Sequence, residues 1–249
     1  MEKREIISGR RAVLEYLISL DSAEGVSLYI SKTSHGKIID TISEEARKRG
    51  IAGERCDRAF LSRFDRSAKH QGVILLTPRH RAEKGVDFLK RTKETRGVLI
   101  LLDHLTDPQN VGSIIRTTEA LGGDAVIIPK SQSATITPAV IKASAGATAH
   151  LETIIVPNIA NFLASAKEAG FWIIGTAQSG TIDPARAREL RPAVIVIGSE
   201  EKGMRRLTEE QCDCTVSIPL KGKISSLNAA VAAGIILYEM LREDTGHFD

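Results

Sequence analysis

Residues 98–123 read VLILLDHLTDPQNVGSIIRTTEALGG, an apolar run followed by an amphipathic stretch. Val98–Leu102 has no polar residue in alternate positions, which is typical of a strand buried on both faces of a parallel sheet. A helix is predicted to open at Thr106-Asp107-Pro108, with the proline at its first position, and to close at Gly122-Gly123. A buried strand followed at once by a helix is the repeating unit of an α/β fold.

The same alternation continues to the end of the chain. Thr137-Pro138 and Asn158 are predicted to start two more helices. The further strands that the apolar runs predict are Ala125–Ile128, Ile154–Val156, Phe171–Ile174, Val194–Ile197 and Thr215–Ile218. We therefore predict that residues 97–249 form a doubly wound α/β domain around a parallel sheet.

A smaller α/β pattern precedes this domain, over residues 1–77. Ala12–Ile18 is amphipathic, Val26–Ile30 resembles a strand, Gly36–Arg49 has helical spacing of apolar residues, and Gly72–Thr77 predicts a last strand. Residues 78–96 open with a proline and carry seven Lys or Arg against three acids. We interpret them as a basic linker, with at most one short helix, between the two domains.

Composition indicates an ordinary globular protein. The chain has 249 residues, of which 42% are apolar and 26% charged. Its longest apolar run, Ala229–Tyr238, is about half of the roughly twenty residues that a membrane span requires. Glu2, Glu5 and Glu15 near the start are unlike a secretory signal or a mitochondrial presequence. We expect a cytoplasmic protein with no membrane association.

The charge is unevenly distributed along the chain. Residues 1–96 hold 21 Lys and Arg and 14 Asp and Glu, whereas residues 97–249 hold 13 and 17. The front part thus carries seven excess positive charges and the back part four excess negative ones. This asymmetry indicates an anionic partner held by the front part, although a basic solvated surface is an equally simple interpretation.

Several kinds of chemistry find no support in the sequence. Cys212 and Cys214 lack partners at metal-ligand spacing, so we expect them to pack at a strand edge and expect no metal site. The chain has no dinucleotide-binding G-x-G-x-x-G, no phosphate loop and no G-x-S-x-G nucleophile elbow. His104 follows a predicted strand, but a lone histidine there is more often structural.

Three segments at the ends of predicted strands remain as candidates. In the first, Asn110 lies in the opening turn of a helix, where free N–H groups favour an anion, and Arg116 lies off the apolar stripe. An amide and a guanidinium there suit a phosphate or a developing oxyanion, although Arg116 could simply pair with Glu119 on the surface.

The second and third candidate segments lie near the C-terminal end. Gly198 in the second would let a ligand approach the backbone, and Glu200 follows just beyond the strand, although a plain tight turn would look the same. In the third, Ser225 and Ser226 are predicted to cap a helix over 226–242. That helix is apolar on every side, so it must be buried in the domain and against a second subunit.

Together these segments resemble the three motifs of the SpoU (TrmH-like) RNA ribose 2′-O-methyltransferases. The matches are N-x-G-x-x-x-R-T at Asn110–Thr117, I-G-S-E-x-x-G-M at Ile197–Met204 and I-P-x-x-G-x-x-x-S-L-N at Ile218–Asn228. The sequence HQG at 70–72 makes the front domain similar to the ribosomal-protein-like RNA-binding domain of the RlmB branch. That branch methylates a guanosine of 23S rRNA. Arg11 departs from the G-x-H-A-V that usually opens this domain.

The resemblance implies an α/β fold of the SPOUT class, with a C-terminal trefoil knot and a homodimer. It also implies S-adenosylmethionine as the methyl donor. The residues that match cofactor-contacting positions are Gly198, Ile218, Leu227 and, less directly, Thr176.

The resemblance likewise implies a set of catalytic residues. Arg116 matches the catalytic arginine, but a guanidinium is a poor base, so we expect it to hold a phosphate and stabilise the developing alkoxide. Asn110 would position the target nucleotide. Glu200 and Asn228 would orient Arg116 and the ribose, and Ser226 would support the loop. The alternatives are a tRNA ribose methyltransferase and a non-catalytic RNA-binding protein of ribosome assembly.

Overall fold

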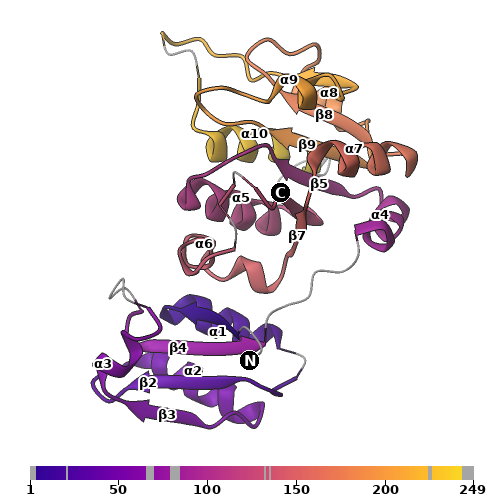
Figure 1. Cartoon of the computed structure of the whole chain (residues 1–249). Helices are drawn as coiled ribbons and strands as arrows, with labels where there is room; N and C mark the ends of the chain where they lie inside the picture. Colours follow the sequence, from indigo (N-terminus) through magenta and orange to yellow (C-terminus); the bar gives the residue numbers. More distant parts are fainter. Residues whose placement is uncertain are drawn as a thin grey trace, which may run out of the picture. The chain divides into compact units, whose positions relative to one another are not determined.

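The computed structural model describes residues 4–20, 22–65, 70–78, 85–131, 133–134, 136–223 and 226–242, with the side chains of 85–87 left out. The chain forms two compact units (Figure 1). The first comprises Met1–Arg81 and Ile136–His150, and the second comprises Ala82–Thr135 and Leu151–Asp249. The segment 136–150 therefore belongs with the front part of the chain.

The first unit is built on a mixed sheet. Its described strands are β1 (Arg4–Ser8), β2 (Ser27–Ser31), β3 (Gly53–Cys56) and β4 (Val73–Pro78), in the order β1-β4-β2-β3. β4 runs antiparallel to both β1 and β2, and β3 runs parallel to β2. Its helices are α1 (Arg10–Ser19), α2 (Lys37–Lys48), α3 (Arg58–Leu61), α6 (Pro138–Ala143) and η1 (Ala147–Ala149).

Apolar side chains of helices and sheet form the core of the first unit. Leu17 of α1 and Ile42 of α2 are buried in one cluster with strand residues such as Leu75. Ile141 of α6 belongs to this same cluster, and the Tyr16 hydroxyl hydrogen-bonds Thr148 at 3.0 Å. These contacts explain why 136–150 folds with this unit. Burial raises the pKa of Tyr16 well above its ordinary value.

The predicted pattern of the first unit is confirmed for α1, α2, β2 and β4. The predictions missed β1 and β3. β3 has the sequence GERC with three exposed residues, so it shows no hydrophobic alternation, and it is recruited only by its pairing with β2. β1 is short and lies at the very start of the chain.

The second unit contains the predicted parallel sheet. The described strands are β5 (Val98–Leu102), β6 (Ala125–Pro129), β7 (Glu152–Val156), β8 (Trp172–Thr176), β9 (Ala193–Ile197) and β10 (Cys214–Val216). They lie in the order β10-β8-β9-β5-β6-β7, and every pairing is parallel. β5, β6 and β9 are buried throughout, as their uninterrupted apolar sequences predict.

Helices cover this sheet: α4 (Gly85–Glu94), α5 (Pro108–Ala120), α7 (Ile159–Glu168), α8 (Pro184–Ala187), α9 (Arg206–Glu209) and α10 (Ala229–Leu241). The predicted starts at Pro108 and Asn158 are confirmed, because Asp107 and Asn158 each accept a backbone N–H in the first turn. The predicted start of α6 is confirmed by the Thr137 cap.

Three local predictions were wrong. The last helix is capped by Asn228, and not by Ser226, so it begins at Ala229. The last strand covers Cys214–Val216, which leaves Ile218 in the loop that follows. The predicted linker contains α4, whose Phe88 and Leu89 are buried in the core of the second unit.

The strand order locates the place where a ligand would bind. From β5 the chain proceeds outward to β6 and β7 on one side, and it returns to β9 on the other. β5 and β9 are therefore the adjacent strands at which the winding reverses, and ligands of open α/β sheets bind at the carboxyl ends of such a pair.

Among the described residues no helix is long and apolar enough to cross a membrane. The trefoil knot stays a prediction, and residues 224 and 225 of the third motif lie outside the described residues.

Candidate active site

A cavity of about 680 Å³ lies at the carboxyl ends of β5 and β9. Its walls come from the loop and first turn that follow β5, from the loop that follows β9, and from the first residue of α10. Two of the predicted catalytic residues, Asn110 and Glu200, line it. The cavity thus lies where the strand order predicts a ligand site.

Asn110, Glu200 and Asn228 form one hydrogen-bonded group. The Asn110 amide Nδ2 donates to Glu200 Oε1 at 2.9 Å, and Asn228 Nδ2 donates to Asn110 Oδ1 at 2.8 Å. Asn228 Nδ2 also donates to Glu200 Oε1. The three motifs, far apart in the sequence, therefore meet at one point.

The start of α10 explains why Asn228 lies there. Its Oδ1 accepts the backbone N–H groups of Ala230 and Val231 at 3.0 and 3.2 Å, which makes it the helix cap. The Ala229 N–H donates to Glu200 Oε1 at 3.0 Å. A carboxylate is favoured at the positive end of a helix, so α10 holds Glu200 in place. Glu200 and Asn228 are exposed, so this group is open to a large substrate.

Asp103 and His104 also line the cavity, and the sequence interpretation did not single out Asp103. Asp103 is 1% exposed; its Oδ2 accepts the Arg205 backbone N–H at 2.7 Å, and its Oδ1 pairs with His104 Nδ1. This carboxylate ties the end of β5 to the loop after β9. Its position directly after a buried strand is the sequence feature that could have identified Asp103 as a site residue. His104 has a partner, as expected for a structural histidine.

Basic side chains form part of the same cavity wall. Lys202, Arg205 and Arg206 line it, all from the loop that follows Glu200 and the start of α9. The sequence interpretation did not assign them a role, although they follow directly on the second motif. Cationic side chains beside an open polar site suit a polyanionic substrate.

Arg116 does not join the group of Asn110, Glu200 and Asn228. It lies six residues after Asn110 on α5, which turns it by about 120° from that residue around the helix. The side chain is exposed, and it makes no hydrogen bond or ion pair, including the suggested one to Glu119, with any residue that the structure describes. Ser226 is exposed in the loop before α10.

Three of the four predicted cofactor residues lie at or near the ends of neighbouring strands, and Leu227 lies just before α10. Thr176 ends β8, Gly198 follows β9, and Ile218 lies two residues beyond β10, where β8 is adjacent to both β9 and β10. Thr176 Oγ1 donates to the Val196 carbonyl at 3.0 Å. Ile218 and Leu227 are half-buried. The partly buried side chains of Ile218 and Leu227 offer apolar contact to a ligand.

Gly198 is closely surrounded by the protein's own backbone, and its contact with a ligand stays a prediction. A Cβ at this position would lie 2.3 Å from both the Gly203 carbonyl carbon and the Met204 nitrogen. Gly203 and Ser199 also exchange two backbone hydrogen bonds, at 2.8 and 3.0 Å. The close approach that requires glycine is therefore made by the chain's own turn at 199–203.

The described residues contain no group of three or more His, Cys, Asp or Glu side chains placed to hold a metal ion. Cys212 is half-buried against the core of the second unit, and its Sγ donates to the Thr208 carbonyl at 3.4 Å. Burial, reinforced by nearby acids, raises the pKa of Cys212 to about 12. This cysteine packs as predicted.

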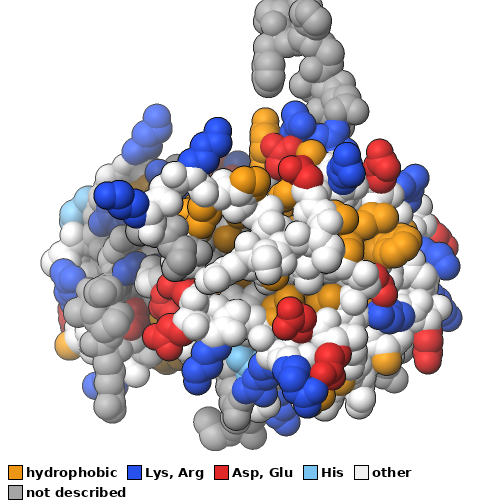
Figure 2. Space-filling view, turned by 90° about the horizontal axis from the view of Figure 1, so that it is seen from above, with side chains coloured by type: hydrophobic (Ala, Val, Ile, Leu, Met, Phe, Trp, Pro, Cys, Tyr) orange, Lys and Arg blue, Asp and Glu red, His pale blue; other side chains and the backbone are white. Residues whose placement is uncertain are grey.

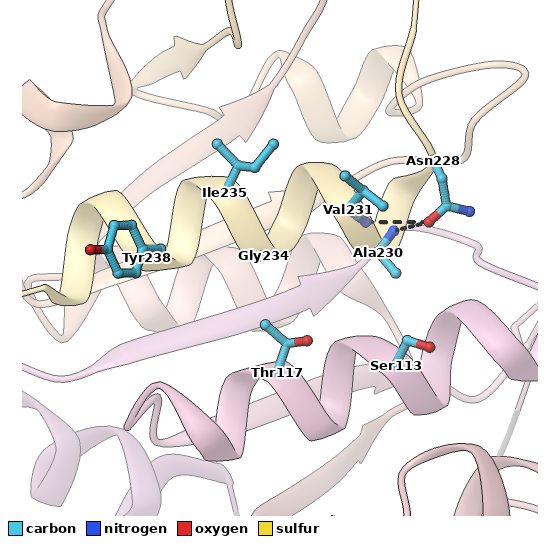
Figure 3. A pocket seen from close by; sticks show the side chains of 8 residues that line it. All are labelled: Ser113, Thr117, Asn228, Ala230, Val231, Gly234, Ile235 and Tyr238. Atoms are coloured by element: carbon cyan, nitrogen blue, oxygen red, sulfur yellow. Dashed lines mark hydrogen bonds between the residues drawn. The ribbon is translucent and has the colours of Figure 1, made fainter.

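A second hollow, of about 540 Å³, lies between α5 and α10 (Figure 3). Figure 3 shows Ser113 and Thr117 of α5 pointing toward α10, whose Val231, Ile235 and Tyr238 line the hollow. Val231 and Tyr238 are each 51% exposed. Apolar patches are visible among charged side chains in Figure 2 as well. α10 therefore has one buried face and one apolar face open to solvent.

Two family models match separate parts of the chain. The family model described as "SpoU rRNA Methylase family" matches residues 97–238. The model described as "RNA 2'-O ribose methyltransferase substrate binding" matches residues 6–82.

Similar proteins cover almost the whole chain. A Staphylococcus aureus (strain COL) protein, whose name assigns it to the TrmH family of tRNA/rRNA methyltransferases, is 38% identical over 96% of each chain. The crystal structure of the SpoU methyltransferase AviRb from Streptomyces viridochromogenes superposes with a TM-score of 0.76 at 26% identity, covering 96% of this chain and 88% of that one. The AviRb complex with the cofactor AdoMet superposes with a TM-score of 0.77 at 24% identity, covering 96% and 89%.

Proposed function

Because the chain belongs to the SpoU rRNA methylase family, we propose that its second unit transfers a methyl group from S-adenosylmethionine to a ribose 2′-hydroxyl of RNA. The observation that carries this proposal is the meeting of Asn110, Glu200 and Asn228 at the carboxyl ends of β5 and β9. In a protein without catalytic activity, nothing would require three polar side chains from three segments to be hydrogen-bonded to one another. This argues against a purely RNA-binding protein.

S-adenosylmethionine is the cofactor of the family, and it supplies an electrophilic methyl group on a sulfonium. The residues at the ends of β8, β9 and β10 fit it. Ile218 and Leu227 are half-buried and would offer apolar contact to the adenine. Thr176 would position the β8 end through its bond to Val196, and Gly198 would act by shaping the 199–203 turn.

The attacking ribose 2′-oxygen must lose its proton as it bonds the methyl carbon. Asn110, Glu200 and Asn228 can orient the ribose hydroxyls, because amides donate and accept while the carboxylate accepts. A guanidinium is a poor base, so we do not assign Arg116 as the base. We assign it to the neighbouring phosphate and to the developing alkoxide, with a phosphate oxygen or water taking the proton. Ser226 would support the loop before α10.

For the substrate, we propose a guanosine of 23S rRNA. The front unit contains the HQG sequence at 70–72, and residues 6–82 match a substrate-binding model of RNA 2'-O ribose methyltransferases. The excess of seven positive charges over residues 1–96 favours a large structured RNA held by its phosphates. A tRNA substrate is the second candidate, because relatives are named for both RNAs.

We further propose a homodimer formed through the exposed face of α10. The hollow between α5 and α10 is lined by Val231, Ile235 and Tyr238, and exposed apolar patches of this kind mark association surfaces. It adjoins the active site, because Asn228 lines the hollow and bonds Glu200. Association would therefore bring a second copy close to the reacting group.

The test of the substrate is a map of 2′-O-methyl positions in rRNA and tRNA from cells with and without the gene for this chain. We expect one guanosine of 23S rRNA to lose its methyl group in the deletion and to regain it when the wild-type gene is restored. Restoration with Asn228→Ser should leave that position unmodified. Loss of a tRNA position instead would favour the second candidate.

A further inference from the structure

A polar cavity of about 460 Å³ lies in the first unit and has no role in the chemistry proposed for the second. It is formed where the start of α1, the loop after β2, the start of α3 and the HQG loop before β4 come together. The residues that line it include Arg10, Ser31, Ser34, Arg58 and Gln71. Guanidinium, hydroxyl and amide groups thus dominate its walls.

Gln71 and Arg10 hold each other in place. The Gln71 side-chain oxygen accepts the Arg10 backbone N–H at 3.1 Å, and the Gln71 carbonyl accepts Arg10 Nε at 3.1 Å. Gln71 has a φ of 54°, in the left-handed region that costs a non-glycine residue about 1–2 kcal/mol. The two bonds stabilise this conformation, and they direct one guanidinium and the positive end of α1 to the cavity.

The serine residues that line the cavity, Ser31 and Ser34, are also held by hydrogen bonds. A Cβ on Gly72 would lie 1.8 Å from Ser34 Oγ, and Gly72 has a φ of 79°, so a larger residue there would be strained. The Ser31 N–H donates to the Gly72 carbonyl at 2.8 Å. Arg55 Nη1 donates to the carbonyls of Ser31 and Ser34 at 3.3 and 3.0 Å. Hydrogen bonds on both sides therefore fix the two serines.

The described residues that line the cavity carry an excess of positive charge. None of its lining residues is an acid. Asp57, the neighbour of Arg58, pairs instead with Lys32 at 3.2 Å. Within the described chain, the Arg58 guanidinium and the terminal nitrogens of Arg10 have no hydrogen-bond or ion-pair partner.

His70 contributes structure to this cavity, not charge. It is fully buried, and its Nδ1 accepts the Gly72 N–H at 3.0 Å. Burial, together with the nearby charge of Arg58, lowers the pKa of His70, which favours the uncharged ring. The positive field of the cavity therefore comes from the two arginines and the start of α1.

We propose that this cavity binds one backbone phosphodiester of the substrate RNA, an inference that rests on the proposed function. Two available guanidinium groups, hydroxyl donors and a helix start are the groups that proteins use for phosphate. No aromatic ring lines the described cavity, so a stacked base is not the ligand. The first unit would then hold the RNA backbone at a specific phosphate site, and not only through a diffuse basic surface.

The test measures RNA affinity of the full-length chain over a range of salt concentrations, with protein-free 23S rRNA and a tRNA transcript as probes. Arg58→Gln removes one guanidinium from the cavity, and Arg47→Gln on α2 is the matched control outside it. We expect Arg58→Gln to weaken binding about tenfold at low salt and to reduce the log–log salt slope by about one. Arg47→Gln should change neither quantity appreciably.

A charge-neutral variant tests the geometry separately. Ser34→Ala removes one buried hydroxyl while both arginines stay, so we expect weaker binding with an unchanged salt slope. If Arg58→Gln and Ser34→Ala bind both RNAs as tightly as Arg47→Gln does, the cavity is not a phosphate site. Micromolar binding of inorganic phosphate without RNA would also overturn the proposal, because it would indicate a site for a small free anion.

The same variants separate this inference from the proposed function. If the cavity proposal fails alone, Arg58→Gln methylates RNA with wild-type KM and kcat. If the proposed function fails, the wild-type chain transfers no methyl group, whereas the affinity difference between Arg58→Gln and Arg47→Gln persists.

Discussion

Glu200 accepts a hydrogen bond from the side-chain amide of Asn228, 28 residues further along the chain. The same asparagine uses its oxygen to cap α10. One side chain thus links the start of a helix to the carboxylate of the second motif. The stability of α10 and the geometry of the site are coupled through it, and substitutions can separate the two.

Asn228→Ala should lower both stability and turnover. Loss of a helix cap costs about 1 kcal/mol, and loss of the amide releases Glu200. Asn228→Ser should restore most of the stability, because serine caps helices well, but its side chain is too short to reach Glu200. We expect both variants to lose methyl transfer on the order of 100-fold. Urea unfolding and single-turnover methylation measure the two effects. Wild-type turnover in Asn228→Ser would remove the amide from the mechanism.

Arg116→Ala should abolish turnover and leave the fold unchanged. The side chain is exposed without a partner in the described chain, so the free energy of unfolding should move by less than about 0.5 kcal/mol. Cofactor affinity should stay near the wild-type value, because the guanidinium is assigned to RNA. Arg116→Lys should not rescue activity, since a point charge does not replace a planar fork. A parallel fall in cofactor affinity, measured by calorimetry, would count against this assignment.

Much of the site could be predicted because its residues follow buried strands. Glu200 lies just after the apolar run of β9, and Asn110 lies in the first turn of the helix that follows the apolar run of β5. A parallel sheet brings such positions to one edge. The parallel sheet itself was predictable from uninterrupted runs such as Val194–Ile197. Local sequence patterns were therefore sufficient to predict most of the strands and helices of the second unit.

Features that depend on distant contacts could not be predicted. Nothing in the sequence of 136–150 indicates that Ile141 packs with α1 and α2 of the first unit. Ser226 and Asn228 are both good caps, and only the bonds of Asn228 to Glu200 and Asn110 decide between them. The cavity of the first unit joins four separated segments, so its two arginines looked like ordinary surface charge.

Gly198→Ala should destabilise the fold. Its new Cβ would lie 2.3 Å from backbone atoms of the 199–203 turn, and such overpacking costs about 1–3 kcal/mol or more. Gly222→Ala is the matched control, because nothing lies within 4 Å of a Cβ at that position. Urea midpoints compare the two variants. An unaltered midpoint in Gly198→Ala would show that the turn yields easily, and the residue could then be tested as a direct cofactor contact.

The exposed face of α10 predicts self-association. Ile235→Glu places a charge in the hollow beside Val231 and Tyr238, so we expect it to convert a dimer to a monomer in sedimentation velocity. Leu207→Glu is the control, because Leu207 is 64% exposed on α9 and lies outside this hollow. A wild-type chain that sediments as a monomer at micromolar concentration would contradict the dimer.

The position of the transferred methyl group tests the central claim most directly. Purified full-length chain would be incubated with S-adenosylmethionine carrying a labelled methyl group and with unmodified 23S rRNA or tRNA transcripts, and the RNA would then be hydrolysed in alkali. A methylated 2′-oxygen cannot attack the adjacent phosphate, so the label should remain in an alkali-resistant dinucleotide. Labelling should be absent with Arg116→Ala and on the order of 100-fold slower with Asn228→Ser. Label recovered on a base in single nucleotides, or equal labelling by wild type and both variants, would contradict ribose methylation at this site.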